Sequence, residues 1–376
     1  MNTEKKTIRQ HYVPQFYFRN FALSDDCLNI FHFSSERCKT MKIQNIAKED
    51  FFYGNDIPAF NFESGLSPFE TQHSEILKKI IECRSLNSLT SDDKQLLHVL
   101  TLFQEARTKS SKMFACYFAN YQFENGKITI DSFNKIPRKI GREIGHPIRT
   151  AFGQLMHAPI LCYEGISDLR TALIVNLTNN DFICSDAPVV RFNQLKIGNN
   201  RQASLFSPGL EIFYPINKSL LLLFYDSNAY DVDFDFDTIC YVNNPKDIDA
   251  INKLQFINAL EFVAFSDIEL EKNIRELNHD IQRLINRSLI HNFGSIEKGK
   301  KLFSNLDSNH WNIFCQLSKY YGYGLELSFT HIKNEYERLW QKKFDKLTKQ
   351  GNNVELIRNE ELKEKVETNL KNKAIR

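Results

Sequence analysis

The sequence changes character near residue 158, and this change restricts the folds open to it. Before that point, apolar residues recur at the spacing of amphipathic helices, as Leu96, Leu100 and Phe103 do. After it, short β-branched or aromatic runs alternate with turn residues, at 160–163, 171–176, 182–185, 212–214, 219–225 and 234–242. This order predicts an α+β fold, in which a helical N-terminal half packs on a mostly antiparallel sheet.

Helical patterns return after the sheet, at 247–262, 267–291, 331–349 and 354–373, and the last two are highly charged. We therefore expect one α+β domain at 1–300 and a charged helical C-terminal appendage at 301–376. Within the domain, the helical part covers about 1–157 and the sheet part about 158–300.

Short-range signals predict where several elements begin. Pro14 suits the first turn of a helix over 14–22, and a hairpin is expected from 28–33 and 38–43. Ser67 and Glu70 have the spacing of a capping box, with Pro68 between them in the first turn of a helix. Further helices are expected from Thr90 and over about 130–157, the latter interrupted by prolines.

Composition indicates an ordinary globular protein with enough apolar residues for a large core, since hydrophobic residues make up 42% and charged residues 25%. The eight cysteines lack metal-site or redox spacing, so we expect reduced thiols and a cytoplasmic location. The first residues have no apolar segment typical of a signal peptide. The longest apolar run, 220–225, is far too short to span a membrane, so no membrane partner is expected.

A net charge of +2 does not mark the whole chain as a nucleic-acid binder. The charge is uneven, however, and the densest basic run contains Lys135, Arg138, Lys139 and Arg142. We expect this run to guide the backbone of a nucleic acid.

The stretch around His11 places costly polar groups among aromatic residues. Gln15 and Arg19 lie four residues apart, on one face of the expected helix, and His11 immediately precedes it. One interpretation is that these side chains cap and hydrogen-bond nearby backbone. The other is a site in which His11 carries a proton or binds a metal and Arg19 anchors an anion.

Asp186 follows an apolar strand and precedes Pro188, a position from which a carboxylate can project into a cleft. It could serve there as a catalytic acid, a base or a metal ligand. The alternative is an Asx turn, in which its side chain bonds the backbone two residues further on. A third polar group, Gln104 and Arg107, lies at the end of an amphipathic helix, where most such pairs are merely solvated.

The opening motif resembles that of a widespread bacterial family known only as a domain of unknown function, number four-two-three-eight. The matching residues are His11, Val13, Pro14, Tyr17 and Phe21, with Phe18 where leucine is usual. Further matches follow in order: Phe52 and Tyr53, Phe69 and Glu70, Gln104, Arg107 and Thr108, Ser185, Asp186 and Pro188, Tyr214 and Pro215, and Asn252, Asn258 and Ala259. The departures are Lys109, Cys184 and Ala187.

This resemblance covers about residues 9–267 and carries no settled activity. Its members look like proteins of bacterial defence against phage, which implies a toxic or nucleic-acid-directed effector.

Our hypothesis is that seven polar residues from distant segments, His11, Gln15, Arg19, Glu70, Gln104, Arg107 and Asp186, converge into one cleft. Two arginines and a glutamine suit a phosphate, while a histidine with carboxylates suits hydrolysis, with or without a divalent metal such as magnesium. A nuclease or nucleotide-directed hydrolase acting in phage defence is the preferred prediction. His11, Asp186 and Glu70 would be the catalytic residues, while Gln15, Arg19, Gln104 and Arg107 would bind the substrate.

Two other classes of function stay open. The protein could be a non-catalytic sensor that recognises a phage component, a nucleic acid or a nucleotide. Alternatively, the polar residues could form a buried network that only fixes the fold.

Overall fold

The computed structural model describes residues 8–22, 25–53, 62–115, 159, 162–195, 204–304, 308–320, 323–350 and 356–374. Side chains are not described at 62–65, 308–310, 316 and 369–374. The expected helix over 130–157 and the basic run Lys135, Arg138, Lys139 and Arg142 lie outside the described residues. Helices and several mostly antiparallel sheets make up the rest, which confirms the α+β class.

The central sheet has five strands in the order β11-β5-β9-β8-β7, and only the β11–β5 pair is parallel. Its strands are β5 (Arg170–Asn176), β7 (Val190–Asn193), β8 (Leu210–Asn217), β9 (Leu220–Tyr225) and β11 (Ile239–Val242). The expected strands at 171–176, 212–214 and 219–225 are confirmed. Every residue of β9 is buried, which explains its unbroken apolar sequence.

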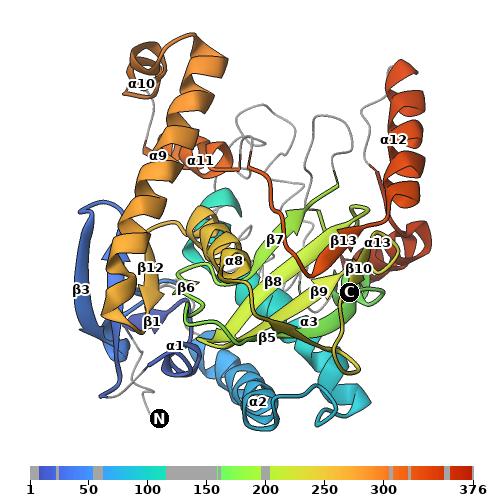
Figure 1. Ribbon diagram of the computed structural model, residues 1–376, viewed down its shortest axis with the longest axis horizontal. Coiled ribbons are helices and arrows are strands. Elements are labelled where there is room, and N and C mark those ends of the chain that lie inside the picture. The colour runs from blue at the N-terminus through green and yellow to red at the C-terminus, as the bar shows by residue number, and fades with distance from the viewer. Residues whose placement is uncertain are drawn as a thin grey trace.

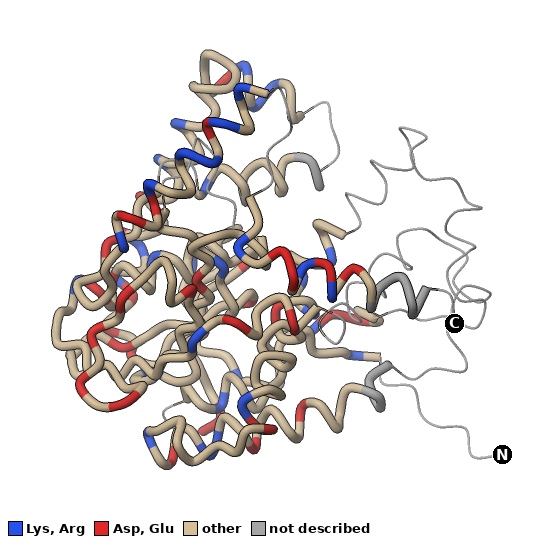
Figure 2. The backbone as a smooth tube through the Cα atoms, turned by 90° about the vertical axis from the view of Figure 1, so that its right-hand side faces the viewer, with Lys and Arg blue, Asp and Glu red and all other residues tan. Residues whose placement is uncertain are grey.

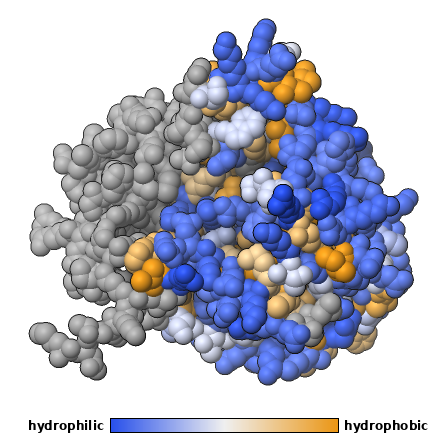
Figure 3. Space-filling model, turned by 90° about the vertical axis from the view of Figure 1, so that its left-hand side faces the viewer, coloured by the Kyte–Doolittle hydropathy of each residue, from blue (hydrophilic) through white to orange (hydrophobic). Residues whose placement is uncertain are grey.

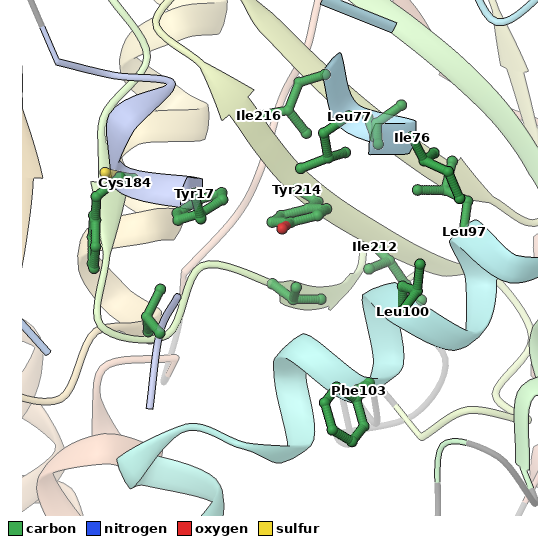
Figure 4. Packing of buried hydrophobic residues seen from close by; sticks show 14 of the residues in the cluster. Tyr17, Ile76, Leu77, Leu97, Leu100, Phe103, Cys184, Ile212, Tyr214 and Ile216 are labelled. Atoms are coloured by element: carbon green, nitrogen blue, oxygen red, sulfur yellow. The ribbon is translucent and has the colours of Figure 1, made fainter. Parts of the chain in front are cut away.

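The two faces of this sheet bury two separate cores. Alternate β9 residues, such as Leu222 and Phe224, join a cluster with helices α1 (Gln15–Arg19), α2 (Phe62–Cys83) and α3 (Ser91–Ala106). The residues between them, such as Leu221 and Leu223, join a cluster with α8 (Pro245–Asn258) and α9 (Glu271–Phe293). In the first core, Tyr17 stacks on Tyr214, with ring centroids 5.5 Å apart (Figure 4).

A second sheet joins the two ends of the region that resembles the family, about residues 9–267. Its order is β3-β2-β12-β6, from β3 (Arg37–Lys42), β2 (Cys27–His32), β12 (Phe262–Phe265) and β6 (Cys184–Ser185). The expected hairpin is thus confirmed, and its strand β2 pairs with β12 from the far end of that region. Of the strand expected at 182–185, only the last two residues are extended and paired.

Two short strand pairs complete the β structure. Strand β1 (Arg9–His11) pairs with β4 (Lys48–Asp50), and β10 (Tyr230–Val232) pairs with β13 (Thr330–Ile332). The prediction of a strand over 234–242 was wrong for its first half. A turn precedes β11 there, and Asp237 in this turn has a φ of 50°. The described part of the strand expected at 160–163 is also wrong, since the 3-10 helix η2 (Tyr163–Ile166) begins there.

The N-terminal helices partly match expectation. Thr90 caps α3, and its side chain and that of Asp93 form the reciprocal bonds of a capping box. Helix α1 is shorter than the 14–22 expected, and Pro14 is its N-cap residue. A 3-10 turn, η1 (Ile43–Asn45), links β3 to β4.

The capping box predicted at Ser67 and Glu70 is wrong. Helix α2 begins at Phe62, so Pro68 lies inside it. The Ser67 carbonyl instead accepts a hydrogen bond from the Thr71 hydroxyl, and Glu70 forms an ion pair with Arg107. The local capping pattern therefore does not form, because the helix already runs through it and Glu70 pairs with a residue far along the sequence.

This correction gives a stability prediction. We expect Pro68→Ala to stabilise the protein by about 1 kcal/mol, because an interior proline removes one helix hydrogen bond and crowds the preceding turn. Ser67→Ala is the matched control and should change stability by less than about 0.5 kcal/mol, since Ser67 is not a cap. Urea denaturation measures both. A costly Ser67→Ala together with a neutral Pro68→Ala would show that the helix begins at residue 68 instead.

The C-terminal helices are α8, α9, α10 (Ile296–Ser304), α11 (Ser308–Ser318), α12 (Asn334–Lys349) and α13 (Glu360–Ala374), and a 3-10 turn, η3 (Ile268–Leu270), precedes α9. Helix α8 ends before the expected residue 262 because β12 starts there, and α9 ends at Gly294 in a left-handed cap. Helices α9 and α10 rise on one side of the molecule, and α12 rises on the other (Figure 1). None of the described helices is long and apolar enough to span a membrane.

The tail after α12 is attached to the domain by Arg358 and by an ion pair of 3.1 Å between Lys365 of α13 and Glu164 of η2. Arg358 forms a two-bonded ion pair with Asp168, with nitrogen–oxygen distances of 2.8 and 2.9 Å. It also donates to the backbone carbonyls of Gly165, Leu205 and Ser207. These bonds hold α13 against η2.

Candidate functional site

The end of α3 and the turn that follows it carry charged side chains that pair with four different parts of the chain. Glu105 pairs with Arg191 at 2.6 Å and Arg107 pairs with Glu70 at 2.7 Å. Lys109 pairs with Glu261 at 2.7 Å and with Glu49 at 3.1 Å. Ion pairs to α2, β4, β7 and the start of β12 therefore meet at this one helix end, which we call the α3-end site.

Arg107 is the buried centre of one half of this site, with 2% of its surface exposed. One guanidinium nitrogen donates to the backbone carbonyl of His11 at 2.9 Å, and Nε donates to the Tyr53 hydroxyl at 3.1 Å. The Tyr53 hydroxyl donates in turn to the same carbonyl. His11, Glu70 and Arg107 are thus brought together as expected, although Arg107 contacts the backbone of His11.

The His11 imidazole is neutral at pH 7, because burial lowers its pKa. Its Nε2 lies 3.3 Å from the carbonyl oxygen of Gln44, and this bond requires the proton to be on Nε2. Nδ1 then keeps a free electron pair. A half-buried neutral imidazole of this tautomer can accept a proton at Nδ1.

Asp186 is the buried centre of the other half, with 1% of its surface exposed. Its carboxylate accepts hydrogen bonds from the backbone N–H groups of Leu260, at 2.9 Å, and Glu261, at 2.7 Å. Burial nevertheless raises the pKa of Asp186 to about 7, against the effect of these two bonds. The Asx-turn interpretation was wrong: Pro188 has no N–H to donate, and the partners lie in the turn between α8 and β12.

Four further groups surround Asp186. The Tyr12 hydroxyl donates to Glu261 at 3.3 Å, and Glu261 is also the partner of Lys109. The Lys319 ammonium donates to the carbonyl of Ala259, and burial lowers the pKa of Lys319 to about 8. Asp186 and Lys319 therefore both have a pKa shifted toward neutral, whereas Tyr12 keeps its proton because burial raises its pKa.

The two halves form one continuous site. His11 contacts the Arg107 half, while the next residue, Tyr12, contacts the Asp186 half through Glu261. Arg107 and Lys109, two residues apart, likewise belong to different halves. The outer members differ from the buried centres in exposure: the side chains of Glu49, Glu70, Lys109 and Glu261 are between 33% and 42% exposed. The site thus has two buried polar centres and, around them, four partly exposed charged residues, which we call the rim.

The other expected site residues lie elsewhere or are unpaired. Arg19 donates to Gln15 at 2.8 Å and pairs with Asp26 at 2.9 Å, and its side chain is half exposed. No hydrogen bond or ion pair among the described residues links Gln15 or Arg19 to the α3-end site. Gln104 is buried beside Arg107, and neither of its amide atoms has a hydrogen-bond partner within the described part of the chain.

Sequence reasoning missed several members, namely Tyr12, Glu49, Tyr53, Lys109, Glu261 and Lys319. Three of them carried a signal: Tyr12 lies inside the opening motif, Tyr53 belongs to one of the further matches, and Lys109 is a departure from the family pattern. Glu261 and Lys319 carried none, because their role depends on packing between distant segments.

The sequence left open whether a divalent metal such as magnesium takes part, and the described residues do not form a site that fits one. Among them, no group of three or more histidine, cysteine, aspartate or glutamate side chains is placed to hold a metal ion. Glu70 is engaged by Arg107, and Asp186 by two backbone N–H groups. The carboxylates of this site are therefore already engaged by partners within the protein.

The fold and site define an α+β protein with a charged network around the end of one helix. A family model described as "Protein of unknown function (DUF4238)" matches residues 9–269, which include most of this site. The chain belongs to that family. No curated protein and no solved structure matches the chain.

Proposed function

We propose that this protein is a hydrolase of nucleic acids or nucleotides that acts in bacterial defence against phage, with its active centre at the α3-end site. The defence setting rests on the resemblance described from the motifs, and the family itself has no assigned activity. The observation that carries the enzymatic part is Asp186. A buried carboxyl group with a pKa of about 7 can both hold and release a proton at neutral pH.

The site residues have complementary roles in this proposal. His11 Nδ1 would accept the proton of the attacking water, since the imidazole is neutral. Lys109, on the partly exposed rim, would contact a phosphate oxygen in exchange for one of its two carboxylate partners. Asp186, whose carboxyl group can release a proton at neutral pH, would protonate the leaving oxygen as the phosphorus–oxygen bond breaks. Its bond to the backbone N–H of Glu261 would also hold that rim residue, and Arg107 would position Glu70 and the His11 segment.

The proposal is tested with His11→Ala and Asp186→Asn in cells challenged by phage. We expect each variant to reduce protection about 100-fold or more while the purified protein still folds, because general acid–base groups contribute about that much to rate. The paired control is Gln15→Ala with Arg19→Ala, which lie outside the site and should retain protection.

Purified protein is then incubated with labelled single- and double-stranded RNA and DNA, with and without magnesium. Loss of cleavage in His11→Ala supports the hydrolase. Unchanged protection in both site variants would overturn the proposal. Binding without cleavage would instead favour the sensor, and unfolding of both variants would favour a purely structural network.

A further inference from the structure

Two helices outside the family-matched region carry exposed rows of basic side chains. On α9, His279, Arg283, Arg287 and His291 recur every fourth residue, and all four are exposed. Helix α10 adds the exposed Lys298, Lys300 and Lys301. Residues four apart on a helix lie on one face, about 6 Å apart along its axis.

Helix α12 repeats the pattern on the other side of the molecule. Arg338, Lys342, Lys346 and Lys349 follow one another at helical spacing and are all exposed. Figure 1 shows α9, α10 and α12 rising toward the same edge of the molecule, and in Figure 2 blue segments predominate in that upper part. Acidic segments are more frequent in the lower body.

The charges on these helices are mostly not neutralised. Near the base of α9, Arg275 pairs with Glu271 and Arg283 lies 3.4 Å from Asp280. Further out, the described structure gives no ion pair to Arg287, Lys298, Lys300 or Lys301. On α12, the same holds for Lys342, Lys346 and Lys349 across the described residues. Such unpaired cations on extended helices favour a polyanion as partner.

We infer that α9–α10 and α12 are two arms that bind the phosphate backbone of a double-stranded nucleic acid. The inference deepens the proposed function, on which it rests, by naming the substrate class. The arms follow residue 269 and so lie outside the part of the chain that the family model matches. A row of cations along a helix suits a row of phosphates without reading base sequence.

A nucleic acid fits these arms better than an anionic membrane. The apolar face of α9, with Ile281, Ile285 and Leu289, is already buried in the core, and Trp340 of α12 is buried too. Among the described side chains, α9, α10 and α12 expose one large apolar residue each, namely Ile290, Leu302 and Leu339. Single exposed residues do not make the broad apolar face that inserts into lipid. Figure 3 shows a mostly hydrophilic surface on the side of α9, with apolar side chains in small patches.

The test measures binding of the full-length protein to a labelled 30-base-pair duplex of DNA or RNA by fluorescence anisotropy over a range of KCl. One variant combines Arg287→Glu, Lys298→Glu and Lys301→Glu, and the other combines Lys342→Glu, Lys346→Glu and Lys349→Glu. The control combines Lys42→Glu, Lys78→Glu and Lys94→Glu, exposed lysines on other elements with the same change of charge.

We expect each arm variant to weaken duplex binding at least tenfold, and to reduce the slope of log Kd against log salt by about 3, one for each lost phosphate contact. The control should change Kd less than about threefold, because its lysines lie away from the arms. Equal weakening by the control, no duplex binding by the wild type, or binding only to phosphatidylserine vesicles would overturn the inference.

The outcome also separates this inference from the proposed function. Duplex binding that depends on the arms, without cleavage of RNA or DNA, would refute a hydrolase of nucleic acids and support the arms. Cleavage that is lost in His11→Ala but unaffected by both arm variants would support the hydrolase and refute the role of the arms.

Discussion

Replacing Arg107 with methionine is expected to lower the free energy of unfolding by about 3 kcal/mol. The guanidinium is buried and holds the carboxylate of Glu70, the carbonyl of His11 and the hydroxyl of Tyr53. Removing one partner of a buried ion pair costs about 3 to 5 kcal/mol. The lower end applies because Glu70 is partly exposed and can be hydrated when it is left alone.

Urea denaturation of Arg107→Met, followed by circular dichroism, measures this loss. Arg287→Met is the control and should stay within about 0.5 kcal/mol of the wild type, because Arg287 is exposed. Glu70→Gln keeps an acceptor for the guanidinium and should lie between the two. A loss below about 1 kcal/mol in Arg107→Met would show that the network is not needed for the fold.

The wild-type protein is expected to gain about 2 kcal/mol of stability as the pH falls from 8 to 6.5, chiefly through Glu211. This side chain on β8 is completely buried, and burial raises its pKa to about 8 from 4.5. One carboxylate oxygen accepts from Gln194, while the other has no partner among the described residues. The folded state therefore holds the proton that the unfolded state has already released.

The direction follows from this difference in proton binding. A raised carboxyl pKa costs nothing below pH 4.5, where both states are protonated, and costs most above pH 8, where the folded state must bury a charge. Each pH unit between these limits changes stability by about 1.4 kcal/mol. Asp186 acts in the same direction up to its pKa of about 7.

Other titrating groups confine the expected gain in stability on acidification to the range pH 6.5–8. Burial lowers the pKa of His73 to about 3 and that of His98 to about 4, so acidification below 6.5 destabilises the fold through them. Lys319, with a pKa of about 8, acts above the window. Glu211→Gln should remove most of the slope between pH 6.5 and 8 in urea denaturation. A variant that keeps the wild-type slope would refute the assignment to Glu211.

The sequence predicts those parts of the fold whose signals are local. The hairpin of β2 and β3 depends on alternation around a turn, and the start of α3 depends on a capping box that Thr90 and Asp93 do form. The same reasoning failed at Ser67, because a cap pattern cannot reveal that a helix already runs through it. It also failed for the strand at 234–242, where alternation hid a turn at Asp237.

The site was predictable only in its motif residues. His11, Glu70 and Arg107 were expected to meet, and they do, since the polar residues of a buried motif need partners. The partners of Asp186 are backbone N–H groups some 74 and 75 residues away, which no side-chain pattern encodes. Glu261 becomes a site residue only because β12 places it beside Lys109.

The pairing of β2 with β12 has a consequence for synthesis of the chain. Asn29, on β2, bonds the carbonyl of Ser266, which is 237 residues further along the sequence. At roughly 5 to 20 residues per second, the ribosome needs on the order of 10 to 50 seconds to deliver that strand. During this interval the edge of β2 that will pair with β12 has no partner strand, and Leu28 and Ile30, which are buried in the fold, are not yet covered. Chaperone occupancy on the nascent hairpin should therefore be highest until translation has passed residue 266.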